Sequence, residues 1–209
     1  MSRLSFGMNF KIRAVIYTTL SFGAAVVLPT ALKFEDYIKT GLVFYTELKP
    51  LHTGFKDTNM RVGSSQLICL EEIRKTDPRY DPSHEDFRPD LVLDMMQEVC
   101  EEPSVALDRF LAWVTEVSKG RPVEGITDTT FFDGGQFDLW CGTYRTEPSP
   151  YGWEGIDLTS LYKGHTGNTD AKLKDIGVPD TRTKPHRADH DAVLLAQVAG
   201  YLLYSKMGW

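Results

Sequence analysis

A histidine and an aspartate that could do chemistry together stand near the end of this 209-residue chain, as His186-x4-Asp191. The pattern of apolar residues predicts a helix over about 189–207, so Asp191 falls in its first turn and His186 just before it. A carboxylate there could hold a divalent cation, and the imidazole could take a proton from water. The adjacent Lys184 and Arg187 are weaker candidates for contacts with nucleic-acid phosphates.

A second candidate carboxylate, Asp138, lies about fifty residues earlier. It follows an apolar segment, 123–132, that predicts a strand, and a Gly134-Gly135 turn, and it begins a helix predicted from Phe137. An acid in the first turn of a helix is also favoured by the helix dipole alone. Asp138 and Asp191 therefore each have a simple structural explanation beside the functional one.

The elements that must position these residues are strands followed by a mixture of helices and a further strand. Three β-rich segments come first and predict an antiparallel meander, and a turn signal, Ser21-Phe22-Gly23, separates the first two. A loop-rich insertion follows at about 52–89, and two helices come after it. The three strands are expected at 10–17, 25–34 and 41–48, and the two helices at about 92–99 and 104–120. This order predicts an α/β fold with a mixed sheet.

The arrangement of strand, glycine turn, Phe137-Asp138, long insert, His186-x4-Asp191 and apolar helix resembles the DEDDh 3′–5′ exonucleases. These form the ribonuclease T-like branch of the ribonuclease H-like fold, and the short phage- and bacterial-type exoribonucleases are the most similar group. The resemblance covers about residues 10–207. It implies one exonuclease-like domain over residues 1–209, with a mixed central sheet flanked by helices.

The resemblance also implies roles for the candidate residues. In this family four acidic residues bind two metal ions, Mg²⁺ or Mn²⁺, which activate a water and stabilise charge on the scissile phosphate. Carried over by motif, Asp138 would be the metal ligand of the second motif and Asp191 that of the last motif. His186 would be the general base.

The first motif of the family, Asp-x-Glu at the end of the first strand, is replaced. The matching positions in this sequence are Tyr17 and Thr19. A phenol and a threonine hydroxyl are poor ligands for Mg²⁺ or Mn²⁺. We therefore expect a pseudo-exonuclease that binds 3′ ends of single-stranded RNA or DNA, with catalysis impaired or lost. Mg²⁺ or Mn²⁺ is expected as cofactor if the chain is active, and an inactive chain could bind none. Two alternatives stay open: an active metal-dependent exonuclease with a rearranged site, and a protein-interaction module on an exonuclease scaffold.

The acidity of the chain is local. The formal net charge is −6, but the segment 71–108 holds 12 of the 29 acidic residues and 4 of the 23 basic ones, so it carries −8. The rest of the chain, with 17 acidic and 19 basic residues, carries +2. The overall acidity therefore does not exclude nucleic acid, and the acidic segment could suit a basic protein partner.

The remaining features bear on compartment and assembly. Residues 14–32 carry no charge, but hydroxyl residues, glycine and proline dilute this run, so strands explain it better than a membrane span or signal peptide. The three cysteines form no Cys-x-x-Cys pair, which argues against a structural zinc site and a disulfide scaffold. Their odd number favours a reducing, cytoplasmic setting. The resemblance leaves a homodimer open, because ribonuclease T-like proteins are often dimers.

Overall fold

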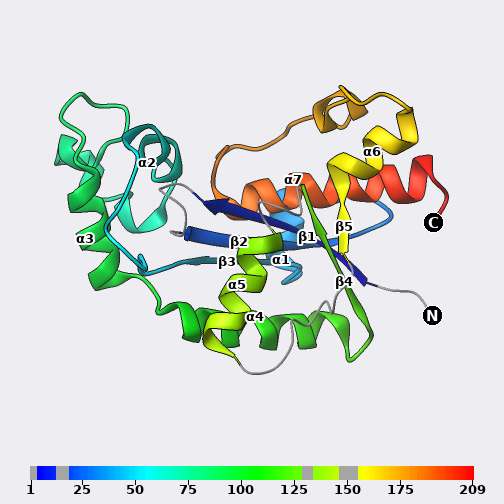
Figure 1. The fold of residues 1–209 in the computed structure, drawn as a ribbon, viewed down its shortest axis with the longest axis horizontal. Coiled ribbons are helices and arrows are strands. Elements are labelled where there is room, and N and C mark those ends of the chain that lie inside the picture. Colours follow the sequence, from blue (N-terminus) through cyan, green and yellow to red (C-terminus); the bar gives the residue numbers. More distant parts are fainter. Residues whose placement is uncertain (1–3, 13–18, 129–133, 146–154) are drawn as a thin grey trace.

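The computed structural model describes residues 4–12, 19–128, 134–145 and 155–209, with the backbone alone for 4–12 and residue 19. Its centre is a five-stranded sheet in the order β3-β2-β1-β4-β5 (Figure 1). β1 pairs antiparallel with β2, and β2 antiparallel with β3, whereas β4 runs parallel to both β1 and β5. The strands are β1 Leu4–Ile12, β2 Thr19–Val27, β3 Val43–Glu47, β4 Val123–Thr127 and β5 Gly155–Asp157. The expected mixed sheet with an opening meander is confirmed.

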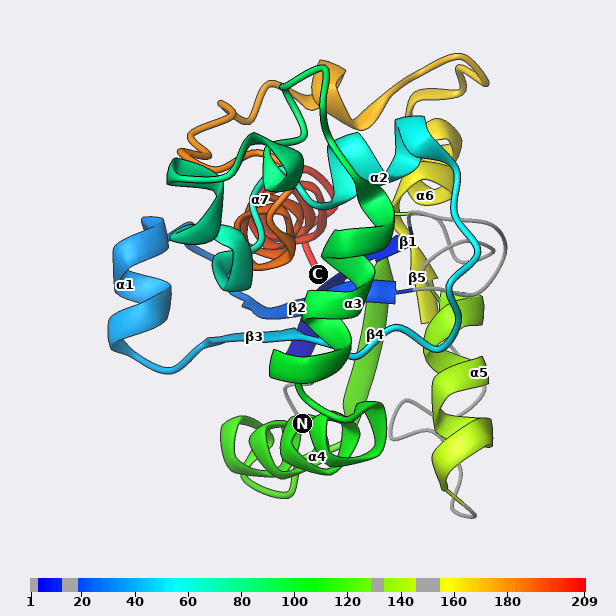
Figure 2. The same ribbon diagram turned by 90° about the vertical axis from the view of Figure 1, so that its left-hand side faces the viewer.

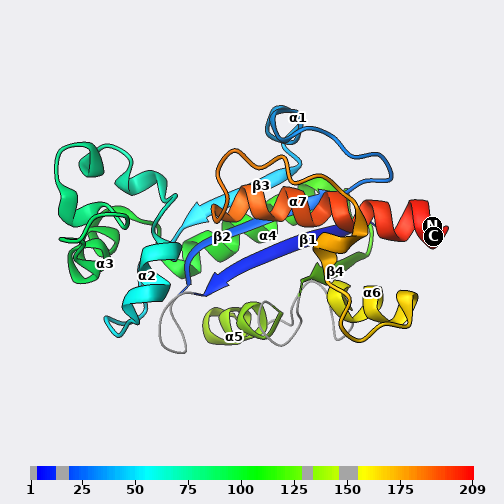
Figure 3. The ribbon, with the colours of Figure 1, turned by 90° about the horizontal axis from the view of Figure 1, so that it is seen from above.

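Helices cover both faces of the sheet. α7 lies across β1 and β2 on one face (Figure 3), and α4 lies on the other side of the sheet (Figures 1 and 2), with α5 packed beside it. The α-helices are α1 Phe34–Lys39, α2 Asp57–Gly63, α3 Pro89–Val99, α4 Pro103–Ser118, α5 Gly135–Tyr144, α6 Leu158–Thr166 and α7 Ala188–Gly200. The 3-10 turns are η1 Ile68–Leu70, η2 Ile73–Lys75, η3 Pro78–Tyr80 and η5 Leu173–Ile176, and a π-helical turn, η6 Tyr201–Lys206, continues α7.

The two faces of β2 belong to two separate cores, because successive side chains of a strand point to opposite sides. Ala25 and Val27 pack under α7 with Ile126 of β4. Phe22 and Ala24 belong to the other core, with α4 and α5. A strand buried on both faces is apolar throughout and shows no alternation.

Glycine brings α7 against the backbone of β2. A Cβ atom added to Gly23 would lie 2.3 Å from the carbonyl oxygen of Ala188, the first residue of α7. At the far end of the helix, a Cβ added to Gly200 would lie 2.3 Å from the carbonyl oxygen of Leu28. The turn expected at Ser21-Phe22-Gly23 is therefore wrong: Gly23 lies within β2 and serves the close approach of the helix.

The other strand boundaries also differ from expectation. The first strand is Leu4–Ile12 rather than 10–17, and the second ends at Val27 rather than running to 34, where α1 begins. A continuous uncharged run gives no periodicity from which to place strand ends. The third strand and the helices expected near 92–99, 104–120 and 189–207 are confirmed with small shifts. The three-residue β5 was missed, because so short a strand has no pattern of its own.

The segment expected as a loop-rich insertion at 52–89 folds into short helices. It contains α2 and the turns η1 to η3, and together with α3 it lies beyond the end of the sheet at which β2 begins (Figure 1). Arg74 connects the turns of this segment. It donates hydrogen bonds to the carbonyl oxygens of Ser64, Ser65, Leu67 and Leu70. A separate apolar core fills it, formed by Leu20, Met60, Leu67, Leu70, Phe87, Val92, Leu93 and Met96.

Within the described part of the chain, no helix combines the length and the apolar character that crossing a membrane requires. The described portion of the uncharged run 14–32 includes β2, which is the second strand of the central sheet.

Candidate functional site

Asp191 lies in the first turn of α7 and is almost fully buried, with 4% of its surface exposed. Its Oδ1 atom accepts a hydrogen bond from Nη1 of Arg182 at 2.7 Å and another from the backbone N–H of His186 at 3.1 Å. A buried carboxylate needs such charged or polar partners to offset its loss of hydration. In this structure an arginine supplies positive charge to the predicted metal ligand.

Arg182 is itself held by a second carboxylate. Its Nε and Nη2 atoms donate to the two oxygens of Asp180, at 2.9 and 2.6 Å. These hydrogen bonds, together with the one from the backbone N–H of Arg182, lower the pKa of Asp180 to about 2. This bidentate pairing fixes the orientation of the planar guanidinium. Its third nitrogen, Nη1, is therefore directed at Asp191.

His186 reaches Asp191 through its backbone. It has φ of +74°, an uncommon value for a residue with a side chain, although histidine tolerates it better than most residues. This conformation accompanies the hydrogen bond from its N–H to Asp191. The side chain is exposed, and its role as general base stays a prediction.

Asp138 belongs to a different layer of the molecule. It lies in the first turn of α5, which packs with α4 on the face of the sheet opposite α7. Its side chain reaches solvent, but the surrounding protein partly desolvates the carboxyl and raises its pKa above the ordinary value. The structure thus places Asp138 and Asp191 on helices that cover opposite faces of the sheet.

One of the two positions assigned to the first motif, Thr19, lies on the second strand. Thr19 begins β2, where its backbone pairs with Ile12, and Tyr17 lies outside the described residues. The expected position of Thr19 at the end of the first strand is therefore wrong. The absence of the acidic pair does not depend on this register, because the sequence contains no Asp or Glu before Glu35.

Lys184 and Arg187, the weak candidates for phosphate contacts, form ion pairs within the chain. Nζ of Lys184 lies 2.5 Å from Glu71, whose pKa it lowers through a hydrogen bond. Arg187 donates two hydrogen bonds to the buried Asp189, at 2.7 and 2.8 Å, and lies over the ring of Tyr45. A ligand would have to compete with these internal carboxylates.

A cavity of about 330 Å³ opens beside Asp191. Its wall combines apolar side chains from α7 with Arg182, Asp180, Lys174 and Asp128, whereas Asp138 does not line it. Asp128 directly follows β4 and accepts a hydrogen bond from the hydroxyl of Thr159 at 2.7 Å. Sequence reasoning missed it because the strand was expected to continue to 132. It also missed Arg182, since the sequence has no motif that pairs this arginine with Asp191.

These residues do not fit a pair of divalent ions. Asp191 already binds a guanidinium, Asp138 starts a helix on the other face of the sheet, and β1 contains no acid. Among the described residues, one group of three potential ligands has its donor atoms within 4.8 Å of one another, and it lies elsewhere, at Glu47, Cys69 and Cys100.

No protein-family model and no curated protein matches this sequence. Solved structures do match. The nuclease domain of 3′hExo, described as a DEDDh family member bound to rAMP, has a TM-score of 0.67 at 13% identity, over 98% of this chain and 94% of that one. A 3′-exonuclease structure is described as 3′-end specific recognition of histone mRNA stem-loop. It has a TM-score of 0.65 at 10% identity, over 98% of this chain and 65% of that one.

A third match is the cell-death related nuclease 4 (CRN-4), with a TM-score of 0.60 at 10% identity, over 97% of this chain and 64% of that one. At these identities the similarity establishes the fold. The chain therefore has the ribonuclease H-like α/β fold found in the nuclease domain of a DEDDh family member.

Proposed function

We propose that this chain is a pseudo-exonuclease, which binds the 3′ end of single-stranded nucleic acid and has impaired or lost metal-dependent cleavage. The observation that carries the proposal is the ion pair of Arg182 with Asp191. On an exonuclease fold, that pair puts a fixed positive charge on the carboxylate that would hold a divalent cation.

Loss of cleavage follows from electrostatics and ligand count. A second cation close to Asp191 would be repelled by the guanidinium 2.7 Å away. Mg²⁺ and Mn²⁺ prefer several oxygen ligands. The first 34 residues supply no carboxylate, and Asp138 lies in the other layer. Two-metal catalysis has too few ligands in this arrangement.

Binding is supported by the cavity and by the fold. A volume of about 330 Å³ is at the lower end of the range for small-molecule pockets and suits one nucleotide. Its apolar side chains could contact a base, while Lys174 supplies positive charge for a phosphate. Arg182 is already paired with Asp180 and Asp191, so a phosphate would compete with these carboxylates for it. Two structures of the same fold are described with rAMP bound and with recognition of an RNA 3′ end.

The acidic segment 71–108 supports a protein-interaction function less well. Glu71 pairs with Lys184, Glu101 with Arg109 and Asp108 with Arg145. These internal pairs reduce the charge that the segment offers to a basic partner.

The binding test is fluorescence anisotropy with single-stranded RNA and DNA that end in a 3′-hydroxyl or a 3′-phosphate. We expect tighter binding of the free 3′-hydroxyl strand. Lys174→Gln should lower affinity and make the slope of log affinity against log salt shallower by roughly 0.7, since one phosphate contact is lost. Lys39→Gln, on exposed α1 away from the cavity, is the matched control and should leave the slope unchanged. Equal binding of blocked and free ends would contradict the proposal.

The cleavage test is incubation of the same strands with Mn²⁺. We expect no progressive shortening from the 3′ end. Shortening by the wild-type chain that Asp191→Asn abolishes would establish instead the alternative of an active, rearranged site.

A further inference from the structure

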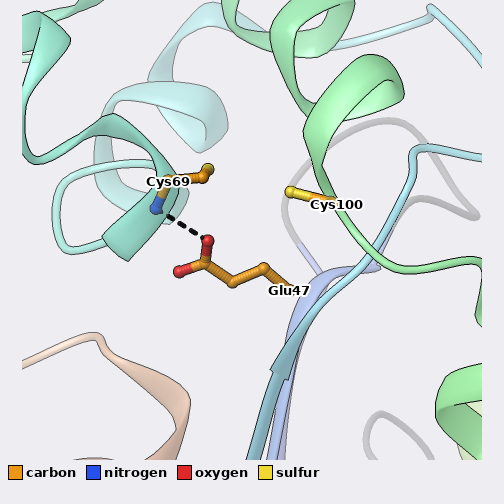
Figure 4. A group of neighbouring side chains, drawn as sticks. All are labelled: Glu47, Cys69 and Cys100. Atoms are coloured by element: carbon orange, nitrogen blue, oxygen red, sulfur yellow. Dashed lines mark hydrogen bonds between the residues drawn. The ribbon is translucent and has the colours of Figure 1, made fainter.

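Three side chains with metal-binding atoms meet where the sheet joins the insertion. Glu47 ends β3, Cys69 lies in η1, and Cys100 follows α3. The carboxylate oxygen and the two sulfur atoms all lie within 4.8 Å of one another. Figure 4 shows Cys69 and Glu47 beside each other, with the sulfur of Cys100 directed toward them from the end of α3.

The carboxylate of Glu47 is held in a defined orientation. Oε1 accepts hydrogen bonds from the hydroxyl of Tyr45 and the backbone N–H of Ile68, and Oε2 accepts one from the N–H of Cys69 at 2.9 Å. The thiol of Cys69 also hydrogen-bonds this carboxylate, so loss of the thiol proton on metal binding would leave that lone-pair position to the ion. Partners of this kind orient metal ligands in proteins.

The donor set selects the class of ion. Two thiols and one carboxylate suit a borderline-soft cation such as Zn²⁺, whereas Mg²⁺ and Mn²⁺ prefer oxygen ligands. Zinc lies about 2.3 Å from sulfur and about 2.0–2.2 Å from a carboxylate oxygen, which puts tetrahedral ligands roughly 3.5–3.8 Å apart. Donor atoms already within 4.8 Å need only a small closure to reach this geometry.

We propose that Glu47, Cys69 and Cys100 bind one Zn²⁺ ion, with a water molecule as the fourth ligand. On binding, both thiols release their protons to solvent and coordinate as thiolates. The ion would fasten η1 and the end of α3 to the end of β3. It would thus fix the insertion to the sheet by a route independent of the apolar core around Met60 and Leu70. The site needs no nucleic acid and no catalytic role.

The proposal is tested with the full chain, kept reduced and stripped of metal by a chelator that is then removed. Co²⁺ is the spectroscopic probe, because a tetrahedral cobalt–thiolate site gives a charge-transfer band and visible bands that Zn²⁺ displaces. We expect these bands to saturate at one Co²⁺ per chain and Zn²⁺ to raise Tm. Cys69→Ser and Cys100→Ser should each lose the charge-transfer intensity and the zinc-dependent rise in Tm.

The third cysteine provides the matched control. Cys141 is buried in α5, in the core shared with α4, and takes no part in the cluster. Cys141→Ala should therefore bind Co²⁺ as the wild-type chain does. Bands that persist when both Cys69 and Cys100 are serine, or their absence in the folded wild-type chain, would overturn the proposal.

A second measurement does not depend on the variants folding. In the wild-type chain, Zn²⁺ should slow alkylation of Cys69 and Cys100, as read by peptide mass spectrometry, and a chelator should restore it. Unchanged alkylation, or a Cys69–Cys100 disulfide that persists in the presence of reductant and excludes the ion, would also contradict zinc binding.

Discussion

Arg182 and Asp191 determine what the start of α7 can bind. The carboxylate is 4% exposed, so the guanidinium at 2.7 Å and the N–H of His186 offset much of its desolvation. The hydrogen bond from Arg182 that stabilises the buried carboxylate also occupies the Asp191 oxygen that a cation would bind. A change of the arginine should therefore alter both stability and cation binding.

Arg182→Gln is expected to lower the free energy of unfolding by roughly 1–3 kcal/mol, because buried Asp191 loses its charged donor. Arg88→Gln is the matched control, since Arg88 pairs with Asp90 on the surface and its loss should change stability much less. Urea unfolding of both variants measures the difference. Equal effects of the two changes would mean that the Arg182 pair is worth no more than a surface pair.

His190 is expected to make stability depend on pH. It is 4% exposed and stacks on Phe34 with ring centroids 3.7 Å apart, and burial lowers the pKa of its imidazole below 6.5. The unfolded chain therefore takes up the proton first, so the stability present above pH 6.5 is lost as pH falls below that value.

Replacement of the imidazole tests this sign. The free energy of unfolding of His190→Leu should fall less than that of the wild-type chain between about pH 7 and pH 5. His165→Gln, at an exposed position of α6, should retain the wild-type dependence. If the free energy of unfolding of His190→Leu changed with pH as much as that of the wild-type chain, other groups would cause the pH dependence.

Among the elements, α7 and β2 depend most on contact between backbones. Gly23 lets the first residue of the helix lie directly on the strand, and any side chain there would overlap the carbonyl of Ala188. Since Asp189 and Asp191 follow within the same turn, this contact also sets the position of the candidate site relative to the sheet.

Gly23→Ala is therefore expected to destabilise the chain by about 1–3 kcal/mol or more, because the added methyl group forces α7 away from β2. Gly142→Ala, within α5, meets no atom within 4 Å and should stabilise by up to about 1 kcal/mol through helix propensity. Thermal unfolding measures both changes. A neutral effect at Gly23 would show that the helix can shift without cost.

Local pattern explains which elements could be predicted from the sequence. α3 and α4 carry an apolar stripe at helical spacing, and α7 has a long, wide apolar face, so their positions were recovered. β2 is buried on both faces and has no alternation, so its ends could not be placed. The pairing of Arg182 with Asp191 depends on loop geometry that no spacing rule encodes. The cluster of Glu47, Cys69 and Cys100 joins distant parts of the chain.

Across the whole molecule, the chain shares its fold with the nuclease domain of a DEDDh family member, whereas β1 contains no carboxylate. The proposed loss of cleavage predicts that restored acids should create a cation site only at the correct register of β1. Asn9 pairs with Gly23, the β2 residue on which α7 begins, and Lys11 pairs with Ser21. We propose that these two positions, rather than 17 and 19, correspond to the family's Asp-x-Glu, because they lie on β1 and 19 does not.

In an Arg182→Gln background, Asn9→Asp with Lys11→Glu should add Mn²⁺ binding, as measured by isothermal titration. Tyr17→Asp with Thr19→Glu in the same background adds the same two acids and is the matched control, for which we expect no added binding, because Thr19 lies on β2. Equal binding by both chains would show that the proposed register is wrong.

The central position of β1 has a consequence for how the chain folds. One neighbour, β2, follows at once, but the other, β4, is made more than a hundred residues later. At synthesis rates of about 5–20 residues per second, one side of β1 stays unpaired for roughly 6–20 s on the ribosome. Such long-range pairing also predicts slow refolding, on a timescale of about milliseconds to seconds. The newly made hairpin thus exposes an open edge, where association with other chains or capture by a chaperone would compete with folding.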